Sequence, residues 1–562
     1  MTKITLEVIK IFKEEKKTFI WIFLLVNLVP IIESVLLYLI YLVIEPINRG
    51  KSIEKVIEFI GEDIWISSLI QDYSIHVLFM LALLFLLLKV SAQYIQARAI
   101  TTQSYNLYMR DVRRVLHAYI YSKYEKVKDI TFETMLNNVM QDSGSLPMLI
   151  KESITIFSAL IILVIYIVIS LFISPQLTLA AFLIFLTTFI INKKLFAVMG
   201  YVGELKIRHV KRVSKFFLEL LGGFKRIKIE GRELDHEKYA DSVIQKTQKW
   251  KIIKRMTEAK IDITTETISV FSFLVILYVG LYLLKIELTL MMMTFLLFTR
   301  IRGSVNIIFK AYGRILIFNK NVSSYFNLLD NFNAVDLDYP DKSMSIKSIQ
   351  MENISFNYDG KEVLDNINFS AHAGDKILIY GNSGEGKSTF LNILAGLYSP
   401  SKGLVFFNNK VLDYKLFLSA RKRIMYVSSD IYLFNDSIIN NIDRNISNLD
   451  LNKCLEKACL SEFIEGLDEG VNTNIGADGS NLSLGQKQRL IASRLFIADS
   501  DIIILDEPTS NLNSDLAKKL MANIMKHISP NAILIIVSHH SFDEIEFTHK
   551  YKISNKTIKM QT

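Results

Sequence analysis

Six long apolar segments are distributed over the first 310 residues of this 562-residue chain. Each approaches the roughly 20 consecutive apolar residues that a helix needs to cross a bilayer. The segments run over residues 18–44, 75–95, 153–173, 176–191, 263–284 and 288–309, and Ser174-Pro175 separates the third from the fourth. We therefore predict a membrane α-helical bundle of six transmembrane helices.

The charged residues between these segments indicate the orientation of the bundle. Residues 192–261 carry 18 Lys and Arg against 8 Asp and Glu, whereas residues 45–73 carry six acids against three bases. Membrane proteins retain basic residues on the cytoplasmic side. We expect a multi-pass protein of the cytoplasmic (inner) membrane, with helical arms over 96–152 and 192–262 in the cytoplasm. This arrangement accounts for the net charge of +9 without a nucleic-acid partner.

The composition changes near residue 330. Residues 331–345 are polar and contain Pro340, and residues 346–562 alternate short β-rich runs with helical runs. Four runs are continuously apolar, as in parallel strands buried on both faces; they cover residues 376–380, 424–427, 502–505 and 533–537. We predict a transmembrane domain with cytoplasmic extensions (1–330), a linker (331–345) and an α/β domain in the cytoplasm (346–562).

The segment after the first of these runs fits the phosphate-binding pattern G-x-x-x-x-G-K-[ST]. Glycines let backbone N–H groups wrap a phosphate, and a helix beginning near Lys387 adds partial positive charge at its N-terminus. Lys387 is expected to reach the β- and γ-phosphates of ATP, and Ser388 to coordinate Mg²⁺. The pattern predicts a P-loop NTPase domain. Its predicted nucleotide-binding residues are Gly381, Asn382, Ser383, Gly384, Glu385, Gly386, Lys387, Ser388 and Thr389.

Two acidic residues, Asp506 and Glu507, end the apolar run over residues 502–505. A strand end beside the phosphate loop is where NTPases hold Mg²⁺ with an aspartate, so Asp506 is expected to share the ion with Ser388. Glu507 is placed to polarise the attacking water as a general base. Together with the phosphate loop, these residues predict ATP hydrolysis.

The segment from Asn481 to Arg489 resembles the LSGGQ signature of ABC transporters, and the resemblance covers essentially the whole chain. It identifies an exporter-type half-transporter with a helical subdomain in its nucleotide-binding domain. The resemblance implies a dimer in which each signature binds the ATP held by the other domain. The residues concerned are Ser483, Gly485 and Gln486, which match, and Leu484, which replaces a glycine.

The same resemblance assigns roles to three further positions. Tyr358 corresponds to the aromatic residue that stacks on adenine, although a packing role at a strand end is the alternative. His539 corresponds to the histidine that contacts the γ-phosphate. Ser429 stands where the family has a glutamine that helps bind Mg²⁺, and Asn513 stands where an aspartate is usual. These departures leave two assemblies open, a homodimer, which we favour, and a heterodimer with one weakened site.

Four ionisable residues interrupt the predicted spans, and such residues usually face a bundle interior or a wet cavity. They are Glu33, Lys89, Arg300 and Arg302. One interpretation is a substrate cavity whose cations bind an anionic headgroup. The other is pairing between helices, with Glu33 neutralising a cation. The pattern resembles that of bacterial lipid-linked oligosaccharide flippases.

These observations predict ATP-driven export or flipping of an amphipathic, anionic substrate, such as a lipid-linked saccharide, lipid or peptide, by alternating access. The resemblance to ABC transporters implies that contacts coupling the two domains lie near residues 119–124 and 224–235. The alternatives are a weakly hydrolysing partner subunit of a heterodimeric exporter for drugs or peptides, and an ATP-gated channel or sensor. A soluble ATPase acting on nucleic acid is disfavoured by the six apolar segments.

Overall fold

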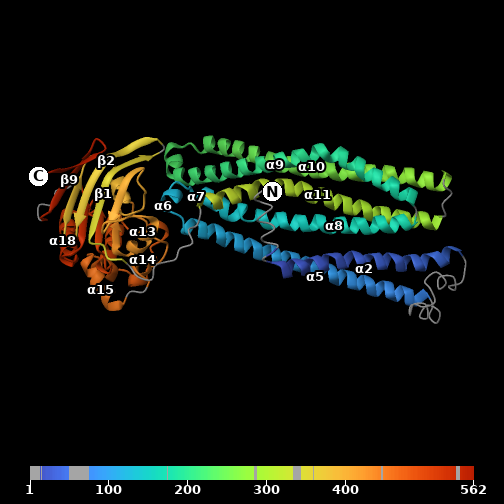
Figure 1. The fold of residues 1–562 in the computed structure, drawn as a ribbon, viewed down its shortest axis with the longest axis horizontal. Coiled ribbons are helices and arrows are strands. Elements are labelled where there is room, and N and C mark those ends of the chain that lie inside the picture. Colours follow the sequence, from blue (N-terminus) through green and yellow to red (C-terminus); the bar gives the residue numbers. More distant parts are fainter. Residues whose placement is uncertain are drawn as a thin grey trace. The chain divides into compact units, whose positions relative to one another are not determined.

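The computed structural model describes residues 13, 15–49, 75–173, 175–283, 288–332, 344–358, 360–444, 447–538 and 545–561. The chain divides into two compact units. One comprises Met1–Ser122 and Asp129–Val335, and the other comprises Lys123–Lys128 and Asp336–Thr562. The first consists of helices and the second of strands and helices (Figure 1). Residues 123–128 thus cluster with the second unit, although the predicted domain boundary lies near residue 330, and most of the predicted linker is outside the described residues.

Long helices form most of the first unit. Five of the six predicted apolar segments lie in one of them, and the segment over residues 263–284 begins in such a helix and continues past its end at Tyr278. The helices are α2 (Lys16–Arg49), α5 (Ile75–Ile120), α8 (Ser145–Ile173), α9 (Pro175–Glu230), α10 (Glu233–Tyr278) and α11 (Leu288–Phe332). The predicted break at Ser174-Pro175 is confirmed, because α8 ends at Ile173 and Pro175 occupies the first position of α9, where proline costs no hydrogen bond. Most of these helices continue far beyond a bilayer's thickness, as the predicted cytoplasmic arms require.

Four helical stretches within the described residues are long and apolar enough to cross a membrane. They are Lys16–Leu36, Phe79–Ile120, Phe132–Leu171 and Glu233–Tyr282. The count of six spans stays a prediction, because residue 174 and residues 284–287, which border the predicted fourth, fifth and sixth spans, lie outside the described part. Short irregular helices connect or extend the long ones: α7 (Phe132–Asn137) and the π-helical segments η1 (Asn138–Asp142) and η2 (Val279–Leu283).

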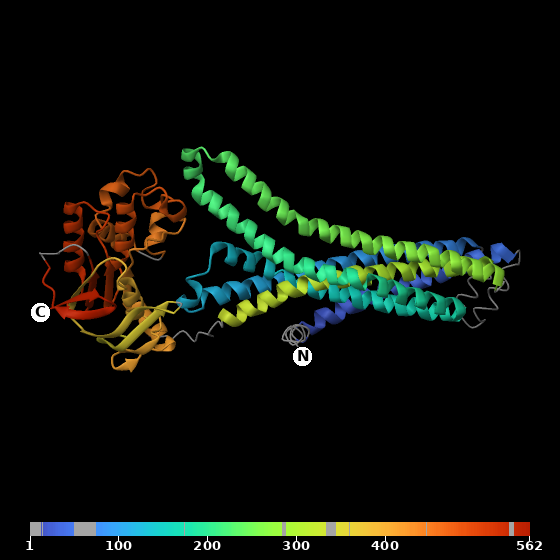
Figure 2. The ribbon, with the colours of Figure 1, turned by 90° about the horizontal axis from the view of Figure 1, so that it is seen from above.

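The helices of this unit pack in neighbouring pairs, α2 with α5, α8 with α11 and α9 with α10. The α9–α10 pair forms a long hairpin, seen in green in Figure 2, that turns at Gly231, whose φ of +62° is strained for residues other than glycine. Phe196 and Phe309 meet edge to face at 5.5 Å in the buried interior. Large apolar side chains such as Phe79 and Met80 instead point outward, which suits contact with lipid.

The second unit is built on two sheets (Figure 1). A four-stranded antiparallel sheet has the order β2-β1-β4-β5, and a six-stranded sheet has the order β10-β9-β3-β8-β7-β6. In the second sheet β9, β3, β8, β7 and β6 are parallel and β10 is antiparallel. The strands are β1 (Ser348–Tyr358), β2 (Lys361–His372), β3 (Lys376–Tyr380), β4 (Lys402–Phe407), β5 (Lys410–Val411), β6 (Ile424–Val427), β7 (Ile502–Asp506), β8 (Ile533–Val537), β9 (His549–Ser554) and β10 (Thr557–Gln561).

The four apolar runs predicted as buried parallel strands are confirmed as β3, β6, β7 and β8, and β7 and β8 are buried along their whole length. The helices of the unit are α6 (Tyr124–Val127), α12 (Lys387–Leu394), α13 (Tyr414–Ala420), α14 (Ile438–Ile442), α15 (Asn448–Lys457), α16 (Ser461–Glu465), α17 (Leu484–Ser493) and α18 (Ser514–His527). Short helices α14 to α16 form the predicted helical subdomain around a second buried cluster that includes Leu433 and Leu455.

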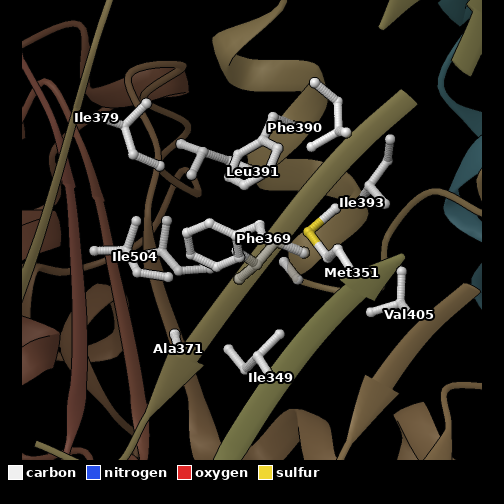
Figure 3. Close-up of a cluster of buried hydrophobic side chains, with 14 of the residues drawn as sticks. Ile349, Met351, Phe369, Ala371, Ile379, Phe390, Leu391, Ile393, Val405 and Ile504 are labelled. Atoms are coloured by element: carbon white, nitrogen blue, oxygen red, sulfur yellow. The ribbon is translucent and has the colours of Figure 1, made fainter. Parts of the chain in front are cut away.

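The larger core fills the space between the two sheets and α12. Figure 3 shows Met351 and Phe369 from the antiparallel sheet facing Phe390 of α12 and Ile504 of β7. The rings of Phe369 and Phe390 meet edge to face at 5.2 Å. Full burial of each such side chain contributes roughly 1.5–3 kcal/mol. This core fixes the start of α12, and with it the phosphate loop, against the end of β3.

Candidate nucleotide site

The phosphate loop connects β3 to α12 and takes a shape that requires its glycines. Gly384 and Gly386 have φ values of +82° and +94°, and residues that carry a Cβ adopt such values only with backbone strain. A Cβ at Gly381 would lie 2.4 Å from the carbonyl oxygen of Ile553. All nine residues predicted from the motif, including buried Thr389, are therefore brought to one loop and the first turn of α12.

Lys387 lies inside this loop. Its Nζ donates to the carbonyl oxygens of Gly381 and Asn382, each at 2.9 Å. Glu385 closes the loop by accepting a hydrogen bond from the backbone N–H of Asn382 at 2.9 Å. The ammonium group is thus held by two carbonyl groups of the phosphate loop, where a phosphate bound to the backbone N–H groups of the loop would be within its reach.

Asp506 gathers two hydroxyl groups at the carboxyl ends of the parallel strands. Its Oδ2 accepts from Ser429 at 3.0 Å and from Ser388 at 3.4 Å, and only 4% of the residue is exposed. Burial raises the pKa of Asp506, and the hydrogen bond from Ser429 opposes that rise. Two hydroxyl oxygens and one poorly solvated carboxylate are the kind of oxygen ligands that Mg²⁺ prefers. The short side chain of Ser429 thus contacts Asp506 directly.

The side-chain oxygen atoms that meet at this site come from one carboxylate and two hydroxyl groups. Within the described ranges, no cluster of three or more His, Cys, Asp or Glu side chains could hold an ion. Mg²⁺ held by one or two protein oxygens completes its coordination with water and nucleotide phosphates. The arrangement therefore suits Mg²⁺ that enters together with ATP.

Glu507 follows Asp506 in a left-handed conformation with φ +52°, and its N–H donates to the carbonyl oxygen of Val537 at 2.9 Å. The backbone of Glu507 is also held by buried Gln488 of α17, whose Nε2 donates to the Glu507 carbonyl oxygen at 2.7 Å. Gln488 Oε1 in turn accepts from the N–H of Asn511 at 3.1 Å. The sequence analysis did not identify Gln488 as a residue of the site. The signal that it offered was a polar amide side chain on the buried face of the signature helix.

The signature segment begins α17 with a complete capping box. Ser483 Oγ accepts from the N–H of Gln486 at 3.3 Å, and Gln486 Oε1 accepts from the N–H of Ser483 at 2.8 Å. A Cβ at Gly485 would lie 2.9 Å from the carbonyl oxygen of Asn511, so this matching glycine is needed for close packing. Leu484 is 60% exposed and does not disturb the fold. The helix start thus presents polar backbone groups to an anion arriving from outside.

The other positions assigned by resemblance differ in what the structure says of them. Tyr358 ends β1, half-buried, with its ring edge to face with Phe356 at 4.9 Å. Asn513 caps α18 by accepting from the N–H of Leu516 at 2.9 Å, so the usual aspartate is replaced by an equally good cap. His539 lies outside the described residues.

Three of the four ionisable residues predicted to line a cavity meet in the helical unit. Glu33 Oε1 lies 3.0 Å from Lys89 Nζ and 2.8 Å from Arg300 Nη1, which joins α2, α5 and α11. Arg302 is separate and pairs with Glu266 at 3.8 Å. The Glu33 group thus contains two cations and one carboxylate, and Arg300 remains 46% exposed.

Comparison with known protein families accounts for both units. The model of the ABC transporter transmembrane region matches residues 19–305, and that of the ABC transporter domain matches residues 364–510. The chain belongs to the ABC transporter family. Its transmembrane region is joined to an ATP-binding domain of the same family, and the chain is a multi-pass protein of the inner membrane with the ATP-binding domain in the cytoplasm. The predicted fold class and family are confirmed.

Several relatives of this ABC transporter are known. A probable ABC transporter ATP-binding/permease protein of Haemophilus influenzae is 29% identical over 59% of this chain and 61% of its own length. An ATP-dependent lipid A-core flippase of Wigglesworthia glossinidia brevipalpis is 32% identical over 62% of this chain and 60% of its own. The alignments thus span about three fifths of these relatives.

A solved structure of a bacterial Atm1-family ABC exporter with ATP bound has the same fold. It superposes with a TM-score of 0.80 at 17% identity, covering 98% of this chain and 95% of that one. The chain therefore has the fold of an ABC exporter. Half-transporters of this family generally work as dimers, which agrees with the predicted assembly.

Loss of the Gln488 bridge is expected to lower ATP turnover about tenfold and ATP affinity much less. Gln488→Leu removes the hydrogen-bond partner of the Asn511 N–H and one of the partners of the Glu507 carbonyl oxygen, which keeps Ser510. Each lost bond costs about 0.5–1.5 kcal/mol, and the backbone of Glu507 is held less firmly. Gln488→Glu, which keeps the acceptor for Asn511 and loses the donor to Glu507, should fall between. Steady-state hydrolysis and ATP binding by the purified transporter test this, and unchanged turnover in Gln488→Leu would contradict it.

Proposed function

We propose that this transporter uses ATP hydrolysis to export or flip an amphipathic, anionic substrate across the cytoplasmic membrane by alternating access. The observation that carries the proposal is the convergence of Ser388 and Ser429 on Asp506, next to Glu507 and the phosphate loop. This hydrolytic arrangement belongs to the same chain as the ABC transporter transmembrane region. ATP hydrolysis and movement through the membrane are therefore expected to be coupled.

In the proposed cycle, Lys387 exchanges its two carbonyl partners for β- and γ-phosphate oxygens when ATP enters the loop. Ser388 and Asp506 would hold Mg²⁺, which would supply positive charge beside the phosphates, and Ser429 orients the Asp506 carboxylate. Glu507 accepts the proton of the attacking water. Ser483 and Gln486 of the second chain close the site over the γ-phosphate, and His539 is proposed to contact the same group.

We favour a homodimer because the three departures from the family pattern are accommodated. Ser429 contacts Asp506 directly, Asn513 caps α18, and Leu484 is exposed without crowding its own domain. A heterodimer with one weakened site is the alternative, since a serine is shorter than the usual glutamine. Turnover by the chain purified alone favours the homodimer, and turnover only after addition of a related half-transporter favours the heterodimer.

The substrate class rests on the positive charge of the group around Glu33 and on the relatives that are lipid A-core flippases. The half-exposed guanidinium of Arg300 shares the carboxylate of Glu33 with Lys89, so these three side chains carry a net positive charge. An anionic headgroup would neutralise that charge.

The coupling contacts proposed over residues 224–235 are supported by exposed apolar residues on both sides of the hairpin tip, Phe224 and Leu234.

ATPase activity of the purified chain in lipid nanodiscs tests the proposal. Lipid-linked saccharides, anionic lipids and peptides are added in turn, with a zwitterionic lipid of equal chain length as control. An anionic amphiphile that raises turnover severalfold supports the proposal. Stimulation by the zwitterionic control alone would contradict the anionic substrate class, and ATP-dependent ion currents without substrate movement would favour the channel alternative.

Asp506→Asn is expected to stabilise the nucleotide-free transporter by about 2 °C in melting temperature while removing Mg²⁺-dependent turnover. Burial raises the pKa of Asp506, so the ionised carboxylate destabilises the folded state when no cation is present. Because this folded-state pKa is raised, the wild type should gain stability relative to Asp506→Asn as the pH falls through it. Thermal unfolding in EDTA across a pH series measures the difference, and a variant less stable than the wild type would contradict the prediction.

A further inference from the structure

The short helix α6 lies in the chain between α5 and α7 of the transmembrane region, yet residues 123–128 cluster with the ATP-binding domain. Tyr124 stacks on Tyr398, with ring centroids 5.8 Å apart and planes 20° from parallel. The carboxylate of Glu125 accepts a hydrogen bond from the N–H of Ser399. These contacts bring the start of α6 to Tyr398 and Ser399 in the loop after α12, and the Tyr398 ring lies against Tyr358 at the end of β1, with ring centroids 6.0 Å apart.

Lys128, which caps α6, places its ammonium over the ring of Tyr358. Its Nζ lies 3.9 Å from the centroid of Tyr358 and 4.8 Å from that of Tyr398. Cations are attracted to ring faces within about 6 Å, most strongly where water is partly excluded, and all three residues are partly or fully buried. Tyr358 also packs against the domain core, so the face under Lys128 is the one that a ligand can reach.

Adenine stacked on that face would occupy the position of the Lys128 ammonium, because stacked rings lie nearly as close as this cation does. We propose that Lys128 competes with adenine for Tyr358, so that ATP binding displaces Lys128 and loosens α6 from the ATP-binding domain. The inference rests on the proposed role of Tyr358 in nucleotide binding. It assigns to Lys128 a task in nucleotide affinity that its position in the transmembrane sequence does not suggest.

The competition links the nucleotide site to the membrane helices through the chain itself. Any event in the transmembrane region that withdraws α6 also frees Tyr358, and by reciprocity ATP that occupies Tyr358 favours withdrawal of α6. Substrate that moves α5 or α7 would thus change ATP affinity without touching the phosphates. The effect is specific to the base, because Lys387 and the phosphate loop are unaffected by Lys128.

Equilibrium binding to the full chain in nanodiscs tests the proposal, with Glu507→Gln present throughout to prevent hydrolysis. The two ligands are ATP and tripolyphosphate, which has the phosphates without the base. Lys128→Met keeps the length of the side chain and removes its charge, and should lower the Kd for ATP about three- to tenfold relative to that for tripolyphosphate. Lys128→Arg keeps a cation over the ring and should retain the wild-type ratio.

Two further variants separate this effect from a loosened helix. Lys123 lies 5.4 Å over the ring of Tyr414, so Lys123→Met weakens the contacts of α6 without uncovering Tyr358 and should leave the ratio unchanged. In a Tyr358→Ala background, Lys128→Met should no longer improve ATP binding. A ratio that Lys128→Met leaves unchanged or shifts against ATP would overturn the inference alone. A wild type that binds neither ligand would overturn the proposed function as well.

Discussion

Replacement of Glu507 by glutamine is expected to lower ATP turnover at least about 100-fold, because a positioned general base contributes roughly 10²–10⁴-fold to such a step. The amide cannot accept the proton of the attacking water. ATP affinity should change little, since Lys387, Ser388 and Asp506 remain in place. The measurement is single-turnover hydrolysis by the purified transporter, together with ATP binding to the same preparation.

Glu469→Gln is the matched control, because it makes the same chemical change at an exposed position of the helical subdomain. It should leave both turnover and affinity at wild-type values. Turnover that survives Glu507→Gln within about threefold would show that another group activates the water, and the left-handed conformation of Glu507 would then need a different explanation. Such a result would also favour the heterodimer, in which this site contributes little.

Replacement of Glu33 by glutamine is expected to destabilise the transmembrane region by about 3–5 kcal/mol, which is typical when one partner of a buried ion pair is removed. The carboxylate is 12% exposed and pairs with both Lys89 and Arg300. Its loss would leave two cations facing each other between α2, α5 and α11. The yield of folded, monodisperse transporter and its apparent melting temperature measure the effect.

Glu266→Gln provides the comparison, since Glu266 is 69% exposed and its pair with Arg302 spans 3.8 Å. Exposed pairs contribute at most about 1 kcal/mol, so this variant should be nearly wild type. Full recovery of stability in a Glu33→Gln, Arg300→Gln double variant would show that the excess charge caused the loss. A Glu33→Gln single variant as stable as the wild type would contradict the pairing and favour cations that serve the substrate alone.

Local features of the fold were predictable because each has a strong local cause. The strands β3, β6, β7 and β8 coincide with continuous apolar runs, and the phosphate loop coincides with a motif whose glycines adopt positive φ values that other residues take only with strain. The break between α8 and α9 follows from Pro175. In each case the residues that decide the structure lie within a few positions of one another.

Features that depend on packing between distant segments were not predictable in the same way. Periodicity does not reveal that Glu33 meets both Lys89 and Arg300, because the pairing depends on how three helices rotate against each other. Further cations of α11 pair in the same manner, Lys310 with Asp262 at 2.8 Å and Arg314 with Glu152 at 3.0 Å. A charged residue near an apolar segment indicates that an oppositely charged partner is needed. Which residue serves as that partner depends on how the helices pack.

The roles of Gln488 and Lys128 were missed for a related reason. Gln488 belongs to the signature helix by sequence, yet its amide acts on the backbone of Glu507, 19 positions away. In the sequence, Lys128 is one of many basic residues in a predicted cytoplasmic arm. Its position over Tyr358 follows from the packing of residues 123–128 within the unit that contains the ATP-binding domain. Both residues act through groups that a linear motif does not contain.

The central claim is that hydrolysis at Glu507 drives an anionic amphiphile across the membrane. Its most direct test is transbilayer movement of a fluorescent anionic lipid in proteoliposomes, measured for the wild type and Glu507→Gln with and without ATP and Mg²⁺. The account predicts movement in the wild type with ATP and Mg²⁺, and none beyond the background of empty liposomes in Glu507→Gln. Equal movement in both proteins, or hydrolysis by the wild type with no movement of any anionic amphiphile supplied, would contradict it.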